Sequence, residues 1–375
     1  MSTQRLDRVV AALGAQRLGG LALMPDANLT YLSGLTFHQG KRLTLALIPA
    51  DGTPPCFVLP ALEQAQAAAK SRITLRYFPW NDADGPHAAL AAAVAAAFPT
   101  GLTGAELAVE MTCLRVMELR ALEATMPSLR TTDASDMMAA LRMVKDAQEL
   151  AVIETAVRMV EVALQHTIAQ IRVGMTERTL SRLCTEAIIA AGADGESFAN
   201  IVAGGPNGAN PHHSNSDRPF QAGDLIIIDC GARYDGYISD ITRTVALGEP
   251  TTEARRIYEL VREANEAGRR AAQPGATGST IDAAARGVIV AGGYGDYFLH
   301  RTGHGFGIEA HELPNIVAGS DKPLAPGTTF TVEPGIYLPG RTGVRIEDDL
   351  VMTPDGARSL TTLPRELLVL RDCRL

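Results

Sequence analysis

The order of apolar and polar positions indicates that the first third of the chain alternates between strands and helices. Short apolar runs predict strands at residues 21–24, 43–48, 56–59, 73–78 and 107–109. Amphipathic or alanine-rich segments predict helices at residues 5–18, 87–98 and 113–122, and a further helix that ends at residue 69. This alternation is typical of an α/β domain with a partly parallel sheet. It contains no Gly-x-Gly-x-x-Gly after a strand, so nothing supports nucleotide binding.

The pattern changes between residues 126 and 133, which predicts two domains, residues 1–132 and 133–375. Helical periodicity then predicts helices at residues 136–143, 147–171, 252–271 and 280–291, and another that ends at residue 191. Asp146 is the predicted N-cap of the longest helix. A strand at residues 198–202 and two hairpins complete this part. Helix pairs beside an antiparallel sheet indicate an α+β domain.

Two acidic residues flank the first predicted hairpin. A β-branched run reaches Asp229, Asp235 and Gly236 are typical of a turn, and a second run carries Asp240. Folding this ribbon midway between residues 234 and 235 places Asp229 opposite Asp240 on one face. Two like charges so placed repel each other unless a cation lies between them, and a divalent metal ion is the natural candidate.

The second predicted hairpin repeats this arrangement. Its glycine-rich turn is centred near Gly340, which places Glu333 opposite Glu347. Both Asp229 and Glu333 follow a glycine by six residues and precede another by two, which suggests an internal duplication. His304 lies between the hairpins in a glycine-rich segment that is expected to be a loop. Four carboxylates and one imidazole form an oxygen-rich set with capacity for two ions.

The motifs around these five residues resemble the pita-bread metallopeptidases, and among them the Xaa-Pro peptidases, prolidase and aminopeptidase P. They are Ser-Asp-Ile-Thr-Arg-Thr, Gly-His-Gly-Phe-Gly, Val-Glu-Pro-Gly-Ile-Tyr and Val-Arg-Ile-Glu-Asp. The resemblance covers roughly the C-terminal two thirds of the chain. The N-terminal third is only weakly similar to the creatinase-like companion domain of these enzymes. The resemblance implies an α+β pita-bread domain whose curved antiparallel sheet surrounds the metals.

The resemblance also implies roles for the five residues. Asp229 would hold one divalent ion and His304 the other, with Asp240 and Glu347 bridging the two. Glu333 would both bind metal and accept the proton of the nucleophile. An oxygen-rich set suits manganese, while the imidazole leaves cobalt and zinc as alternatives.

Two further histidines correspond to catalytic positions of the resembled family. His311 lies seven residues after His304, where the family has an imidazole that donates a hydrogen bond to the substrate carbonyl or the tetrahedral intermediate. His212 follows a proline and lies seventeen residues before Asp229, which is the spacing of the family's loop histidine. His213 is its neighbour and remains the alternative.

Other residues are candidates for contacts with the substrate or the ligands. His300 is a candidate wall for the proline ring, and Arg42 is a candidate clamp for a substrate carboxylate. Arg345 lies two residues before Glu347 and is placed to hydrogen-bond a ligand carboxylate, although a structural ion pair explains it nearly as well. Thr242, two residues after Asp240, is assigned a similar supporting role.

The function implied by the resemblance is hydrolysis of the peptide bond that precedes proline in a small peptide with proline in second position. Xaa-Pro dipeptides are the favoured substrates, and the alternative is aminopeptidase P action on longer peptides. Methionine aminopeptidase ranks lower because those enzymes generally lack an N-terminal domain of this size. Creatinase-like amidinohydrolases do not keep this ligand set. A non-catalytic binding protein on the same scaffold would be expected to have lost ligands, and all five are present. The resemblance implies a homodimer.

Composition narrows the class of protein. The 375 residues have a net charge of −8 and no basic run, so no nucleic-acid partner is expected. The N-terminal segment lacks the apolar core of a signal peptide, and no apolar run is long enough for a membrane span. We therefore expect a cytoplasmic protein. Five scattered cysteines show no metal-ligand spacing, and Cys230 is expected to point away from Asp229 into the core. The other four are Cys56, Cys113, Cys184 and Cys373.

Overall fold

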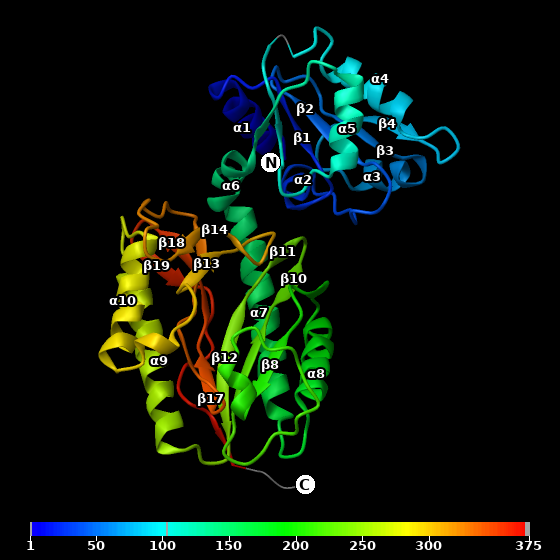
Figure 1. Ribbon diagram of the computed structural model, residues 1–375. Coiled ribbons are helices and arrows are strands. Elements are labelled where there is room, and N and C mark those ends of the chain that lie inside the picture. Colours follow the sequence, from blue (N-terminus) through cyan, green and yellow to red (C-terminus); the bar gives the residue numbers. More distant parts are fainter. Residues whose placement is uncertain (1, 103, 372–375) are drawn as a thin grey trace. The chain divides into compact units, whose positions relative to one another are not determined.

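The computed structural model describes residues 2–102 and 104–371, which form two compact units, Met1–Arg142 and Met143–Leu375 (Figure 1). The predicted boundary between residues 132 and 133 falls inside strand β6 (Thr131–Asp133). This strand pairs in parallel with β5 (Leu107–Val109) and is therefore part of the N-terminal sheet. Helix α6 (Ser135–Met143) follows it and leads to the boundary between the units.

The N-terminal unit is built on a six-stranded sheet with the order β4-β3-β2-β1-β5-β6. The pairs β1–β5, β5–β6 and β3–β4 are parallel, whereas β1–β2 and β2–β3 are antiparallel. The predicted α/β domain with a partly parallel sheet is thus confirmed. The remaining strands are β1 (Gly20–Leu23), β2 (Leu45–Pro49), β3 (Cys56–Pro60) and β4 (Arg76–Trp80).

One helix of this unit, α2 (Ala27–Ser33), was not predicted from the sequence. Asparagine, threonine, tyrosine and serine in this segment have modest helix propensity, so the pattern alone does not indicate a helix. Burial of Leu29, Tyr31 and Leu32 stabilises it, and Gly34 ends it with a left-handed φ of 72°. The other helices are α1 (Ser2–Ala15), η1 (Ala61–Glu63), α3 (Gln64–Lys70), α4 (His87–Ala97) and α5 (Val116–Thr125).

Two helix pairs dominate the C-terminal unit, α7 (Ala147–Ala169) with α8 (Glu177–Ala190) and α9 (Thr252–Ala271) with α10 (Gly278–Ala291). The members of each pair lie side by side, with strands between the two pairs (Figure 1). Asp146 caps α7 as predicted, because its side chain accepts hydrogen bonds from the backbone N–H groups of Gln148 and Glu149.

The strands of this unit form two main sheets and two smaller ribbons. Helices α7 and α8 pack on the sheet β20-β12-β9-β8, while α9 and α10 pack on β16, β17 and the sheet β14-β13-β15-β18-β19. The first sheet contains β8 (Ile201–Gly204), β9 (Leu225–Cys230), β12 (Ile241–Leu247) and β20 (Val369–Leu370). The second contains β13 (Gly303–Gly305), β14 (Glu312–Ile316), β15 (Thr329–Val332), β18 (Asp348–Thr353) and β19 (Gly356–Ser359). The ribbons contain β7 (Gly195–Glu196), β10 (Ala232–Tyr234), β11 (Tyr237–Ile238), β16 (Gly335–Leu338) and β17 (Thr342–Arg345). Two short helices, η2 (Gly205–Ala209) and η3 (Gly295–Tyr297), complete the unit.

The predicted internal duplication has structural counterparts in the two halves of this unit. Gly223 and Gly327, which precede the equivalent acidic residues, both have a φ of 92°. Thr176 caps α8 and Thr277 caps α10, and each of these threonines forms an isolated β-bridge with a proline. Each half therefore consists of a helix pair followed by a ribbon that carries acidic side chains.

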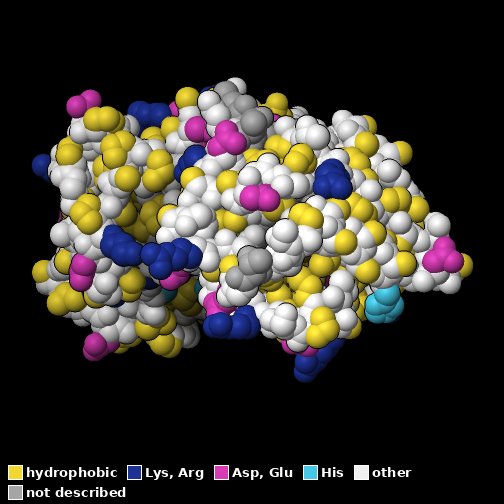
Figure 2. Space-filling view, turned by 90° about the horizontal axis from the view of Figure 1, so that it is seen from above, with side chains coloured by type: hydrophobic (Ala, Val, Ile, Leu, Met, Phe, Trp, Pro, Cys, Tyr) yellow, Lys and Arg dark blue, Asp and Glu magenta, His cyan; other side chains and the backbone are white. Residues whose placement is uncertain are grey.

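The protein has an apolar buried core and a surface that carries both acidic and basic side chains (Figure 2). Acidic and basic side chains are interspersed on the face seen in Figure 2. Among the described residues, no helix has the length and apolar character that a membrane crossing needs. Cys230 is fully buried in the core beside α7 and α8, as predicted, and Cys184 lies in the same cluster. Cys373 lies outside the described residues.

Candidate metal centre

The first hairpin differs in register from the prediction, because Asp229 lies opposite Thr242 and not opposite Asp240. The two turn residues, Asp235 and Gly236, have φ values of 45° and 83°, so the ribbon folds between them, one residue later than the predicted point. The resulting displacement along the partner strand is two residues. Because side chains alternate with a period of two, Asp240 still projects on the face of Asp229. The pairing was wrong, but the shared face is retained.

The second hairpin has the predicted register. Strands β16 and β17 pair Gly335 with Arg345 around Gly340, whose φ is 70°. Extended by two residues, the same register places Glu333 opposite Glu347. The two hairpins are also joined, because the backbone N–H of Glu347 donates to the carbonyl of Thr242 over 3.1 Å. Acidic side chains from both ribbons therefore meet.

His304 lies on strand β13, where the sequence predicted a glycine-rich loop. A Cβ atom on Gly303 would come within 2.0 Å of the Thr331 carbonyl oxygen, and one on Gly305 within 2.2 Å of the Leu313 carbonyl oxygen. The two glycines therefore let neighbouring backbones approach closely enough to form a strand. This close packing holds the imidazole of His304 in a buried position.

Three buried residues, Asp240, His304 and Glu347, offer ligand atoms that all lie within 4.8 Å of one another. The Nε2 atom of His304 is also 3.2 Å from the Glu333 Oε1 atom. The other ring nitrogen, Nδ1, lies 3.1 Å from the carbonyl oxygen of Gly305. A hydrogen bond from Nδ1–H to this oxygen leaves Nε2 directed at the carboxylates, as metal-ligating histidines require.

The electrostatics of the cluster show a shortage of positive charge. Burial and the carboxylates of Glu347 and Asp229 raise the pKa of Asp240 well above its ordinary value. Burial, Glu333 and Asp229 do the same to the pKa of Glu347. Burial also raises the pKa of Asp229, although the nearby charge of Arg345 opposes this. Carboxylates so arranged either retain protons or bind cations.

Two oxygens show that these residues fit a divalent metal ion. The Oδ1 atoms of Asp229 and Asp240 are buried and accept no hydrogen bond from any described residue. A buried carboxylate oxygen without a donor is energetically costly, and coordination of a cation removes that cost. Oxygen-rich sets of this kind suit hard divalent ions.

Arg345 and Thr242 hold two of the carboxylates in place. The Arg345 Nη2 atom donates to Asp229 Oδ2 over 2.6 Å, and its Nε atom donates to the Thr242 hydroxyl over 3.1 Å. That hydroxyl donates in turn to Glu347 Oε2 over 2.7 Å. Arg345 and Thr242 each contact a carboxylate that the sequence predicted as a metal ligand, and Arg345 forms a buried ion pair with Asp229. Their role in orienting metal ligands stays a prediction.

Tyr337 belongs to the same network and was missed by the sequence reasoning. Its hydroxyl accepts a hydrogen bond from Arg345 over 3.0 Å and lies 2.8 Å from His300 Nε2. Burial raises the pKa of Tyr337 to about 12, so the phenol stays neutral. His300 also packs edge-on against Phe298, which forms an aromatic wall. The available sequence signal was the position of Tyr337, four residues after Glu333 on the same ribbon.

The structure brings His311 to the cluster, where its ring centroid is 4.3 Å from that of His304. Burial, His304 and Arg301 lower the pKa of His311 to about 4. His212 is exposed and is among the charges that, after burial, lower the pKa of His311. His213 instead places its Nε2 atom 2.7 Å from Glu177 Oε2.

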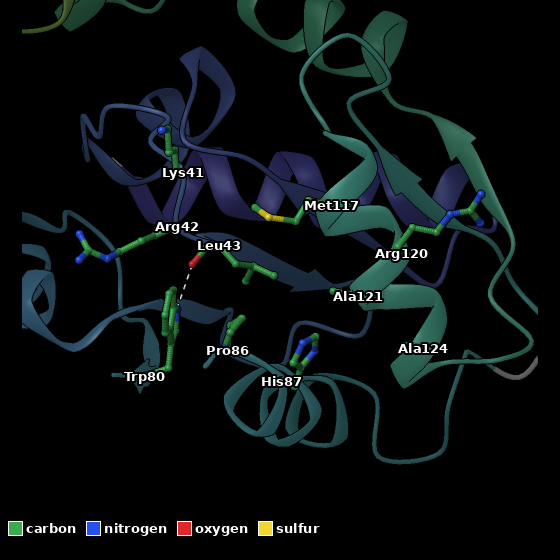
Figure 3. Close-up of a pocket in the computed structure, with 10 residues that line it drawn as sticks. All are labelled: Lys41, Arg42, Leu43, Trp80, Pro86, His87, Met117, Arg120, Ala121 and Ala124. Atoms are coloured by element: carbon green, nitrogen blue, oxygen red, sulfur yellow. Dashed lines mark hydrogen bonds between the residues drawn. The ribbon is translucent and has the colours of Figure 1, made fainter. Parts of the chain in front are cut away.

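Arg42 lies in the N-terminal unit, where its guanidinium donates two hydrogen bonds to the carboxylate of Asp82, one of them over 2.9 Å. It lines an open cavity of about 490 Å³ beside Leu43 and Trp80, whose indole N–H donates to the Leu43 carbonyl (Figure 3). Arg42 thus has an acidic partner within its own unit. Its role as a clamp for a substrate carboxylate stays a prediction.

Comparison with known proteins gives matches along nearly the whole chain. Residues 151–354 match the profile of metallopeptidase family M24, and residues 5–144 match that of the creatinase/prolidase N-terminal domain. The probable dipeptidase PepE of Mycobacterium tuberculosis is 39% identical, over 98% of this chain and 96% of the relative. The Xaa-Pro dipeptidase of Lactobacillus delbrueckii subsp. lactis is 38% identical, over 92% of both chains. A dipeptidase structure from Pyrococcus horikoshii OT3 superimposes with a TM-score of 0.91 at 37% identity, over 98% of this chain and 100% of that one.

Proposed function

Because the chain belongs to metallopeptidase family M24, we propose that it hydrolyses the peptide bond before proline in Xaa-Pro dipeptides. The observation that carries this proposal is the buried cluster of Asp240, His304 and Glu347, whose ligand atoms lie within 4.8 Å of one another. The Glu333 carboxylate adjoins it, 3.2 Å from His304 Nε2, and the buried Oδ1 atoms of Asp229 and Asp240 accept no hydrogen bond from any described residue. The name of the Lactobacillus relative, which is similar along nearly its full length, supports the choice of substrate.

Five residues would hold two divalent ions in this proposal, namely Asp229, Asp240, His304, Glu333 and Glu347. Manganese is the proposed metal because most donors are carboxylate oxygens, and cobalt and zinc are the alternatives. When bound, such ions activate the attacking water and polarise the scissile carbonyl.

The residues around the ions carry the rest of the reaction. Glu333, whose Oε1 atom accepts a hydrogen bond from Thr331 over 3.3 Å, would take a proton from the attacking water. The same carboxyl would pass this proton to the proline nitrogen, which has no hydrogen of its own in the peptide and must gain one to leave. His311, an exposed residue whose ring centroid lies 4.3 Å from that of His304, would donate a hydrogen bond to the carbonyl oxygen. His212 would assist from the loop after η2.

The proline side of the substrate is expected to contact the wall formed by His300 and Tyr337. Their hydrogen bond of 2.8 Å and the edge-on contact between His300 and Phe298 keep this wall rigid. A rigid apolar surface suits the pyrrolidine ring, which has only limited freedom of its own.

The test is turnover of Ala-Pro, Ala-Pro-Ala and Ala-Ala by metal-stripped protein to which manganese is added. We expect cleavage of Ala-Pro only. Cleavage of Ala-Pro-Ala as well would change the assignment to aminopeptidase P, and no cleavage with manganese, cobalt or zinc would favour a binding protein. Asp240→Asn should abolish activity, whereas Asp217→Asn, which removes an exposed carboxylate paired with Arg178, should not.

The assembly and location of the protein stay predictions. The homodimer implied by the resemblance can be tested by light scattering of the purified protein, and the cytoplasmic location by fractionation of cells that express it.

A further inference from the structure

The short loop that carries His311 is closed by the side chain of the next residue, Glu312. This carboxylate folds back along the chain, where its Oε1 atom accepts hydrogen bonds from the backbone N–H groups of Ile308 and Glu309 over 2.8 and 3.1 Å. The two N–H groups precede His311 and the carboxylate follows it. One side chain therefore joins both ends of the turn in which His311 lies.

A buried lysine holds the other oxygen of this carboxylate. The Nζ atom of Lys145 lies 3.2 Å from Glu312 Oε2, and the two side chains are only 1% and 5% exposed. A Cβ atom on Gly307, two residues after β13, would come within 2.9 Å of Lys145 Cε and 3.1 Å of Glu312 Oε1. The missing side chain of Gly307 therefore lets the ion pair lie against the loop. Separation of such a buried pair is strongly unfavourable, so its geometry is well fixed.

The backbone of Lys145 is fixed by contacts outside the loop. Its N–H donates to the carbonyl of Gly327 over 2.9 Å. Val144, the residue before it, forms an isolated β-bridge with Thr328, and Asp146, the residue after it, caps α7. Lys145 is therefore held between two elements of secondary structure and can serve as a fixed anchor for the loop.

The position of the His311 imidazole depends on this loop because His311 is an exposed residue. Its ring lies edge-on to the buried ring of His304, with 4.3 Å between the centroids. A group that acts in catalysis and is displaced by about 1 Å can lose about 100-fold in rate. A small shift of the loop backbone would therefore be enough to impair His311.

We propose that Lys145 and Glu312 are positioning residues, which hold the loop so that the His311 imidazole can donate its hydrogen bond to the substrate carbonyl. This inference rests on the proposed Xaa-Pro hydrolysis. Neither residue touches the substrate or the metal ions, and Lys145 acts on His311 through the carboxylate of Glu312. Loss of the ion pair therefore slows the reaction without weakening the binding of substrate or metal.

The first test measures turnover of Ala-Pro by manganese-loaded Lys145→Met. The kcat value should fall by about 10- to 100-fold, while KM and the dissociation constant for manganese change less than about twofold. Lys145→Arg keeps the positive charge and should recover most of the loss. An unchanged kcat in Lys145→Met, or a rise in KM as large as the fall in kcat, would overturn the proposal.

A matched pair of variants separates loss of position from loss of stability. Glu161 is also buried, and its carboxylate also accepts hydrogen bonds from two backbone N–H groups, those of Thr362 and Leu363. Glu312→Ala and Glu161→Ala should both be less stable in urea unfolding, but only Glu312→Ala should have a lower kcat. Equal losses of kcat in the two variants would refute a specific role of Glu312.

A cycle of single and double substitutions tests whether the ion pair acts through His311. In a His311→Ala background the group to be positioned is absent, so Lys145→Met should lower kcat less than about twofold further. Losses that multiply in the double variant would refute the proposal. Lys145→Met leaves a buried carboxylate charge without its lysine, so Lys145→Met combined with Glu312→Gln, which removes both charges, should regain stability while kcat stays low.

A measurement without turnover distinguishes failure of this inference from failure of the proposed function. In zinc-loaded protein, which is diamagnetic, NMR of the histidine side chains reports the surroundings of His311. Its ring signals should be shifted by the neighbouring ring of His304 in the wild type, and should move toward those of free histidine in Lys145→Met, with those of His300 unchanged. If the wild type cleaves no peptide, the proposed function fails, yet this movement still supports positioning by Lys145. Identical His311 signals in the two proteins refute it.

Discussion

The buried hydroxyl of Thr242 connects the two hairpins that carry the candidate metal ligands. It donates to Glu347 Oε2 over 2.7 Å and accepts from Arg345 Nε over 3.1 Å. Replacement of Thr242 by valine keeps the shape of the side chain and removes both hydrogen bonds. Glu347 would lose the donor that orients its carboxylate, and Arg345 would lose one of its acceptors.

The size of the effect follows from the chemistry of the lost contacts. A hydrogen bond to a charged group contributes about 1.5–3 kcal/mol. Loss of a partner that orients a metal ligand typically weakens metal binding by about 10- to 100-fold, equivalent to about 1.4–2.8 kcal/mol. The two values agree. We therefore expect Thr242→Val to raise the dissociation constant for manganese by about 10- to 100-fold.

Thr244→Val is the matched control for this measurement. Thr244 lies two residues further along β12, is equally buried, and exchanges its hydrogen bonds with the backbone of Arg345 over 2.8 and 3.2 Å. The Thr244→Val variant loses two hydrogen bonds, as Thr242→Val does, but neither of the two involves a carboxylate of the cluster. Calorimetric titration of metal-stripped protein with manganese gives the affinities, and urea unfolding gives the stability of each variant.

The manganese affinities of Thr242→Val and Thr244→Val together test whether the hydrogen bond from Thr242 to Glu347 supports metal binding. Equal weakening of manganese binding in both would refute a specific contribution of the bond between Thr242 and Glu347. Unchanged affinity in Thr242→Val would argue that Glu347 is not a ligand. Loss of stability in both variants with loss of affinity in Thr242→Val alone is the expected result.

Three further predictions concern pH, packing and metal removal. Burial raises the pKa of Glu110 from 4.5 to about 7, so between these values the folded state binds more protons and the free energy of unfolding falls as pH rises, by about 3 kcal/mol in all. Glu110→Gln should flatten this slope in urea unfolding between pH 5 and pH 8; an unchanged slope would assign it to another group. Gly343→Ala would place a Cβ atom 1.9 Å from the Gly208 carbonyl oxygen and should destabilise the protein by more than about 2 kcal/mol in thermal unfolding. The control Gly287→Ala, in an open helical position, should stabilise it by up to about 1 kcal/mol. Manganese at 100 times its dissociation constant should stabilise the protein by about 2.7 kcal/mol, and a chelator should reverse this; a melting temperature indifferent to metal would contradict a metal site.

The hairpins illustrate how far local patterns determine a site. The turn residues Asp235 and Gly236 were identified from their chemistry, but the fold point was misplaced by one residue, which moved the partner of Asp229 from Asp240 to Thr242. A displacement of two residues preserves the face of a strand, so the acidic side chains were still assigned to one cluster. The second hairpin, with its turn at Gly340, agreed in register.

Elements that are stabilised by contacts between distant segments could not be predicted from the local sequence pattern. Helix α2 has modest intrinsic propensity and is stabilised by burial of its apolar residues. Strand β13 looks like a loop because it contains two glycines, yet these glycines permit its close approach to other backbones. Tyr337 acquires its hydrogen bond with Arg345 only when strands β16 and β17 pair.

The sequence by itself determined the two-part organisation, the helices with caps, the turns and the identity of the acidic and histidine cluster. These features follow from local propensity and from the spacing of residues along the chain. Both are properties of single strands, helices and turns and do not depend on contacts with the rest of the molecule. Only the tertiary structure decided that Thr242 opposes Asp229 and that Tyr337 joins His300 to Arg345. The physical reason is that hydrogen-bond partners, burial and unneutralised charge are properties of segments brought together from distant parts of the chain, and local sequence does not encode which segments meet.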